Sequence, residues 1–162
     1  MKRTKFLTQA AMIATIYLVL VEAFKPFAHG IMQVRIAEAL AILPFFTPAA
    51  IPGLTVGVLV SNIIGPYGIV DMVFGTLATF ISAYLSYKMP RKILVPIPPI
   101  IVNALIIGSM LYYVFLGTPD EMSLLTIMFW VGLGQSIACY GLGYPLMKVL
   151  ERYQDKIFDR DK

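Results

Sequence analysis

The apolar stretch IVDMVFGTLATFISAYLSY, residues 69–87, and the basic segment Lys88-Met89-Pro90-Arg91-Lys92 that follows it decide the fold. A helix that crosses a bilayer needs about 20 mainly apolar residues, and basic residues collect in the cytoplasmic loops beside such helices. The pattern therefore predicts a transmembrane helix over residues 69–87 whose C-terminal end faces the cytoplasm.

The rest of the chain has a similar composition. Hydrophobic residues make up 59% of it and charged residues only 14%, whereas about a quarter of a soluble domain is charged. We expect a single all-α domain, an integral membrane bundle over residues 1–162. Its six predicted transmembrane helices cover, approximately, residues 6–24, 34–46, 50–64, 69–87, 96–116 and 123–150. The second of these is too short to span as an α-helix, which rises about 1.5 Å per residue against a hydrocarbon core of about 30 Å. It must therefore start inside the membrane region or lie shielded by protein.

Most of the 13 basic residues fall into three groups: the N-terminus, the segment after residue 87 and the C-terminus. An even number of helices places all three groups on one side of the membrane, so both termini are predicted to be cytoplasmic in a multi-pass protein of the cell membrane. No basic patch carries interleaved aromatic residues, and a nucleic-acid partner is therefore not expected.

Ionisable side chains at membrane depth are costly and point to function. Arg35 and Glu38 are three residues apart and share a helix face, so they either form a mutual ion pair or hold a polar ligand. Asp71 lies at the start of a predicted helix, where it either complements the helix dipole or contacts a ligand. Glu22 and Lys25 repeat the spacing near the external boundary, where we expect an interfacial pair.

Neutral polar and aromatic residues extend the set of candidates for ligand binding. Asn62 either caps a helix or binds, and Asn103 and Gln135 either bond between helices or contact the ligand. Tyr67 and Trp130 belong to an aromatic belt or stack on a flat ligand. His29 has no partner at the spacing of metal ligands, and no metal or cofactor is predicted.

Catalytic motifs are not found in the sequence. It contains no G-x-x-x-x-G-K-[ST], no H-E-x-x-H and no G-x-S-x-G, and its single cysteine, Cys139, has no histidine positioned for acyl chemistry. We therefore expect no enzyme and no ATPase in this chain. Ala10 and Ala14 stand four apart on the first predicted helix, a spacing that lets helices approach closely.

The length, the six helices, the cytoplasmic ends and the pair Ala10 and Ala14 resemble the substrate-binding S components of energy-coupling factor (ECF) transporters. The segment from Gln33-Val34-Arg35-Ile36-Ala37-Glu38-Ala39-Leu40 to Pro44-Phe45-Phe46, with the stretch 53–68, is similar more specifically to the QueT family. The resemblance implies uptake of queuosine precursors, which are 7-deazaguanine bases. It also implies that Ala10 and Ala14 dock a transmembrane coupling subunit that carries two ATPase subunits.

The chemistry of a 7-deazaguanine suits the candidate residues. Its N–H donor edge matches a carboxylate, for which Glu38 and Asp71 are the candidates, and charge-assisted hydrogen bonds are the stronger kind. Asn62, Asn103 and Gln135 can bridge donor and acceptor groups. Two alternatives stay open: an S component for another vitamin-like ligand, and an autonomous secondary transporter, a class often marked by inverted repeats that this sequence lacks.

Overall fold

The computed structural model describes residues 3–25, 35–114 and 123–157, and every regular element in these ranges is helical. In chain order the elements are α1 (Arg3–Ala23), η1 (Ile36–Phe45), α3 (Ala50–Ile64), α4 (Gly68–Tyr87), η2 (Lys92–Leu94), α5 (Ile97–Val114), α6 (Leu124–Ser136), η3 (Ile137–Gly143) and α7 (Tyr144–Ile157). Four stretches of the described chain are long and apolar enough to cross a membrane: Arg3–Ala23, Gly68–Tyr87, Lys92–Tyr113 and Leu124–Gln154. The predicted all-α membrane bundle is confirmed.

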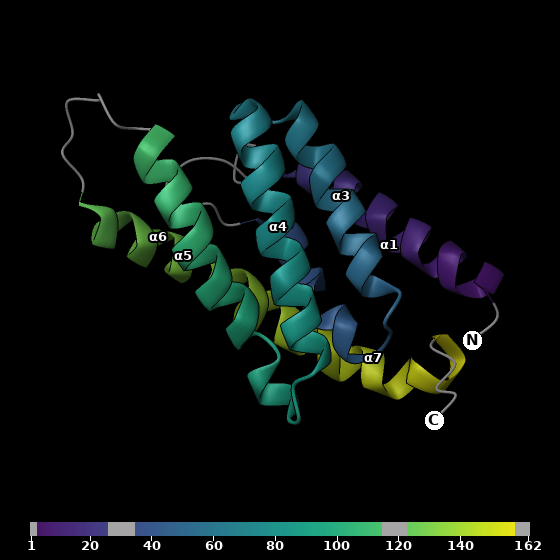
Figure 1. Ribbon diagram of the computed structural model, residues 1–162. Helices are drawn as coiled ribbons and strands as arrows, with labels where there is room; N and C mark the ends of the chain where they lie inside the picture. Colours follow the sequence, from purple (N-terminus) through teal and green to yellow (C-terminus); the bar gives the residue numbers. More distant parts are fainter. Residues whose placement is uncertain (1–2, 26–34, 115–122, 158–162) are drawn as a thin grey trace.

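The helices pack in chain order around a central element. α1 lies against α3, α3 against α4, α4 against α5 and α5 against α6, as Figure 1 shows. The short element η1 contacts α1, α3, α4, η3 and α7, so it is surrounded by the others. Its side chains from Ala37 to Pro44 are all buried. η1 therefore lies inside the protein, as its short length predicts.

The conformation of η1 differs from the predicted α-helix, because its 10 residues form a 3-10 helix. A 3-10 helix rises about 2.0 Å per residue, so η1 spans roughly 20 Å in fewer residues than an α-helix needs. Its hydrogen bonds are poorer, and runs of this length are uncommon. Contacts on all sides, rather than its own hydrogen bonds, hold η1 in place.

The last predicted helix is continuous but changes its winding midway. The residues of η3 form a π-helix between α6 and α7, and the N–H of Tyr144 donates to the carbonyl of Cys139. Pro145 explains this change, since a proline inside an α-helix has no N–H and its ring clashes with the carbonyl four residues earlier. The helix ends at Ile157, seven residues beyond the predicted boundary of 150.

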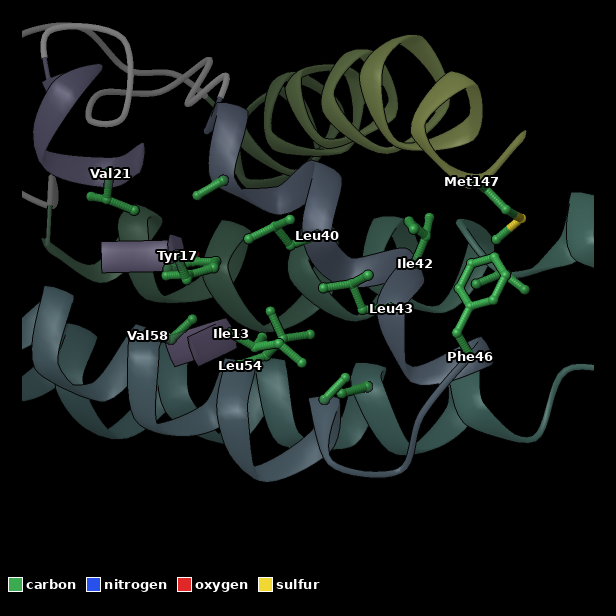
Figure 2. Close-up of a cluster of buried hydrophobic side chains, with 14 residues drawn as sticks. Ile13, Tyr17, Val21, Leu40, Ile42, Leu43, Phe46, Leu54, Val58 and Met147 are labelled. Atoms are coloured by element: carbon green, nitrogen blue, oxygen red, sulfur yellow. The ribbon is translucent and has the colours of Figure 1, made fainter. Parts of the chain in front are cut away.

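The close approach of α1 and α3 depends on small residues in both helices. A Cβ added at Gly53 would lie 2.8 Å from the Ala10 carbonyl oxygen, and one at Gly57 would lie 3.1 Å from that of Ala14. Beside this contact, Ile13 of α1 packs in the core that Figure 2 shows, with side chains of α3 and η1. The backbones of α1 and α3 therefore meet almost directly.

The segments that carry the basic groups meet at one end of the bundle. Gln9 Nε2 of α1 donates to the carbonyl of Ile157 at 3.2 Å, and Lys92 forms an ion pair with Glu151 of α7. Figure 1 shows the start of α1 and the end of α7 at this end. The arrangement agrees with the prediction that the N-terminus, the segment after residue 87 and the C-terminus share one side of the membrane.

Candidate ligand-binding site

Glu38, on the first turn of η1, is the centre of a buried polar network. The hydroxyl of Tyr17 donates to Oε1 at 2.6 Å, and the amide of Gln135 donates to Oε2 at 2.9 Å. The exposed fraction is 6% for Glu38, 1% for Tyr17 and 5% for Gln135, so all three residues are buried. Each of the two carboxylate oxygens of Glu38 therefore accepts a hydrogen bond from a buried side chain.

Asp71 forms the second part of the network, one turn into α4. Its Oδ2 lies 3.4 Å from Nη2 of Arg35, and its backbone carbonyl accepts from the Asn62 amide at 2.9 Å. The residue has no exposed surface, and among the described residues no donor reaches its Oδ1. The N-terminal end of α4 stabilises a negative charge at this position.

Gly75 makes the link between Asn62 and Asp71 possible. A Cβ at this position would lie 2.3 Å from Nδ2 of Asn62 and 3.0 Å from Oδ1 of Asp71. The absent side chain leaves room for the Asn62 amide to cross from α3 to α4. A side chain at residue 75 would therefore collide with the Asn62 amide and crowd the Asp71 carboxylate.

Five of the predicted ligand-binding residues belong to this network, and Tyr17 joins them. We call the network the polar cluster; its members are Tyr17, Arg35, Glu38, Asn62, Asp71 and Gln135. Arg35 and Glu38, for which the sequence left a mutual ion pair or a polar ligand open, interact electrostatically, and Arg35 also forms an ion pair with Asp71. The reason is tertiary, because α4 brings its first turn against η1. Asn62 does not merely cap α3, since its amide bonds to the next helix.

Three predicted ligand-binding residues make contacts outside this cluster. The amide of Asn103 donates at 2.9 Å to the carbonyl of Pro99 on its own helix. Tyr67 packs against the apolar core between α4, α5 and α6. The ring of Trp130 meets that of Phe129 edge to face, with centroids 5.9 Å apart. A ligand contact at these residues stays a prediction, and His29 lies outside the described residues.

Two participants were not among the predicted residues. Tyr17 is buried in the middle of an apolar helix, and the sequence signal is its hydroxyl, which needs a partner when buried. Cys139 donates through Sγ to the Glu38 backbone carbonyl at 3.5 Å. Its place in the π-helical segment next to Gln135 brings it there, and π segments are frequent at functional sites.

Ala10 and Ala14, the predicted docking residues, lie against Gly53 and Gly57 of α3. The spacing of four residues places both alanines on the side of α1 that contacts α3. The small residues on the exposed face of α1 are different ones: Thr8, Ala11 and Thr15. A partner contact at Ala10 and Ala14 stays a prediction, and the exposed face offers the more accessible surface.

The polar cluster combines charged and neutral polar side chains. Among the residues that the structure describes, no group of three or more His, Cys, Asp or Glu side chains converges as a metal site requires. The cluster offers a guanidinium, two carboxylates, two amides and a phenol, which are the groups that recognise the edges of a polar heterocycle.

Comparison with known families identifies the chain. The family described as QueT transporter matches residues 7–152, which is most of its length. Comparisons with curated proteins and with solved structures gave no match. The chain belongs to the QueT transporter family, as its sequence predicts, and this membership makes it a transporter with a small-molecule substrate.

Proposed function

We propose that this member of the QueT transporter family is the substrate-binding S component of an ECF uptake transporter. In this proposal the polar cluster captures a queuosine precursor, a 7-deazaguanine base such as queuine or its aminomethyl precursor. A coupling subunit and two ATPase subunits then drive its import. The resemblance supplies the class of partner and of ligand, and the structure supports it through the chemistry of one buried site.

The observation that carries the proposal is the unpaired oxygen of Asp71. Oδ1 is buried and accepts no hydrogen bond from any described residue, which is costly for a carboxylate. The N1 and exocyclic amine of a deazaguanine are neighbouring N–H donors, and a carboxylate is the matching acceptor. Glu38 has lone pairs left after its bonds to Tyr17 and Gln135, because each carboxylate oxygen accepts more than one hydrogen bond.

Titration of the purified protein with queuine by calorimetry tests the ligand. We expect Glu38→Gln and Asp71→Asn each to weaken binding by about tenfold or more, since hydrogen bonds to charged groups contribute about 1.5–3 kcal/mol. Glu22→Gln is the matched control, because Glu22 is exposed and pairs with Lys25 outside the cluster. Unchanged affinity in both cluster variants would show that the carboxylates do not bind the base.

The proposed docking surface is the outer face of α1. Ala11 and Thr15 are small and exposed, so a helix of a coupling subunit can approach closely there. We expect Ala11→Trp and Thr15→Trp to abolish ATP-dependent uptake while queuine binding stays intact. Ala14→Trp is a less specific test, because a bulky side chain there also forces α1 away from α3.

Uptake that survives both outer-face variants would place the docking surface elsewhere. Uptake by the chain alone, driven by a proton gradient in vesicles without ATP, would instead support a secondary transporter. A different ligand that copurifies with the protein and is identified by mass spectrometry would keep the S component and change its substrate.

A further inference from the structure

The last helix of the chain is longer than a membrane crossing requires. The stretch from Leu124 to Gln154 is helical over 31 residues, which at about 1.5 Å per residue gives roughly 46 Å, against a hydrocarbon core of about 30 Å. Its charged residues begin at Lys148, in the middle of α7. Figure 1 shows that α7 crosses the end of the bundle and does not run alongside α4 and α5. The charged half of α7 therefore extends past the hydrocarbon core.

α7 has one face in the protein and one face outside it. Met147 is 1% exposed, and Leu146 and Leu150 pack against the same core, which includes side chains of η1. The opposite face is exposed and carries two basic residues, a valine and a tyrosine: Lys148, Val149, Arg152 and Tyr153. A helix with basic residues on its outer face and apolar residues on the other is typical of helices that lie in the membrane interface.

Contacts with the segment before α5 hold α7 in place. Glu151 forms an ion pair with Lys92, and the hydroxyl of Tyr140, in the preceding π-helical segment, donates to the Ile93 carbonyl at 2.8 Å. The exposed face of α7 is therefore a fixed surface.

The two cations on this face lie close together without an acidic partner. Lys148 and Arg152 are four residues apart on one helix, a spacing at which like charges repel one another. Among the described side chains, no ion pair joins either of them to a carboxylate. With Val149 and Tyr153 they line a hollow of about 310 Å³. An anion in this hollow would relieve the repulsion, and a guanidinium matches the oxygens of a phosphate.

The tyrosines at this end of the bundle indicate the depth of the hollow. Lys148 Nζ lies 5.1 Å from the centroid of the Tyr144 ring, and Lys88 Nζ lies 4.6 Å from that of Tyr84. Further exposed tyrosines lie at the same end: Tyr87, Tyr140 and Tyr153. Tyrosines collect at the level of the lipid headgroups, where the phosphates of the bilayer are concentrated. A lipid phosphate therefore fits this hollow better than the surface of a soluble protein does.

We propose that the exposed face of α7 binds the headgroup of an anionic phospholipid, with the phosphate between Lys148 and Arg152. The acyl chains then extend into the bilayer beside the bundle, and α7 is anchored in the interface. Basic residues beside membrane helices bind anionic headgroups in this way. The inference goes beyond the proposed function, because it depends neither on the substrate nor on a coupling subunit.

The experiment titrates the full-length protein, in a nonionic detergent, with phosphatidylglycerol and separately with phosphatidylcholine of the same acyl chains. Native mass spectrometry measures the fraction of protein that carries each lipid. We expect wild-type protein to bind phosphatidylglycerol at least about fivefold more tightly, since each basic residue near an anionic headgroup strengthens binding by roughly fivefold. The double variant Lys148→Gln/Arg152→Gln should reduce this preference to about twofold or less.

The matched control is Lys88→Gln/Arg91→Gln, which removes the same charge from exposed residues outside α7 and should keep the preference. An equal loss in both double variants would overturn the site and assign the preference to overall charge. Equal affinity of wild-type protein for the two lipids would overturn the proposal without the need for any variant, and would leave the face for an acidic protein surface. Displacement of the lipid by millimolar inorganic phosphate would overturn the lipid assignment and indicate a site for free phosphate.

Discussion

Gly53→Ala should test whether the direct contact between α1 and α3 holds the bundle together. The new Cβ would lie 2.8 Å from the Ala10 carbonyl oxygen and 3.0 Å from the Cβ of Ile13. Real Cβ atoms essentially never approach a neighbour within 3.0 Å, and here the neighbour is backbone. The helices must therefore move apart, because a carbonyl inside a helix cannot rotate away.

The expected loss of stability follows from two opposing terms. Overpacking of a well-packed core typically costs about 1–3 kcal/mol. Replacing glycine by alanine in a helix interior returns up to about 1 kcal/mol. Gly132→Ala is the matched control in α6, because its Cβ would meet only the Cβ of Ala104 at an ordinary 3.4 Å. Both variants gain the same helix propensity, so their difference isolates the overpacking of about 1–3 kcal/mol.

Thermal unfolding in detergent measures this difference. At roughly 2–4 °C per kcal/mol for a chain of this size, Gly53→Ala should unfold several degrees below Gly132→Ala. The intrinsic fluorescence of Trp130 provides the signal, and equilibrium unfolding in mixed micelles provides the free energy. Equal midpoints for the two variants would show that α1 can shift at no cost, and would refute the close contact as a source of stability.

Tyr17→Phe removes the hydroxyl that donates to Glu38, so we expect the free energy of unfolding to fall by about 1.5–3 kcal/mol, measured in mixed micelles. Gly75→Ala should displace the Asn62 amide from its bond to α4 and cost about 1–3 kcal/mol in the same assay, because the new Cβ would lie 2.3 Å from Nδ2. Cys139 is 0% exposed, and we expect its thiol to react with a maleimide only after the protein unfolds.

Matched variants keep these predictions specific. Tyr140→Phe removes a hydroxyl that donates to the Ile93 carbonyl at the exposed surface, so it should change stability much less than Tyr17→Phe. Gly132→Ala serves again as the control for Gly75→Ala. Labelling of Cys139 at equal rates in folded and unfolded protein would contradict its burial.

The membrane fold was predictable because its determinants are local in the sequence. An apolar run of bilayer length forms a helix whatever its neighbours do, since no backbone group can stay unpaired in lipid. Residues 69–87 match α4 to within one residue, and the N-terminal part of α1 lies beside the end of α7, as the grouping of the basic residues predicts. The shortness of the second helix left two placements open, a start inside the membrane region or a position shielded by protein, and η1 takes the second.

The sequence predicted most members of the polar cluster but not which of them contact one another. Arg35, Glu38 and Asp71 could be identified from the sequence, because a charged side chain is costly and therefore rare at membrane depth. Which of them pair depends on helices that are distant in the chain: Asp71 reaches Arg35 from α4, and Gln135 reaches Glu38 from α6. The spacing of Arg35 and Glu38 left a local pair or a ligand contact open, and the tertiary arrangement adds a further partner to each of them, Asp71 and Gln135.

The rotation of α1 about its own axis is the clearest example of a feature that the sequence does not determine. This helix is apolar on nearly all sides, so its sequence does not distinguish a face that meets lipid from a face that meets protein. The resemblance implied that Ala10 and Ala14 dock a partner, and the structure places them beside Gly53 and Gly57 of α3. The sequence alone determined that the protein forms apolar helices with the polar residues for one site. Only the packing of those helices decided which small residues meet α3 and which side chain, Tyr17, reaches the carboxylate at the centre of the site.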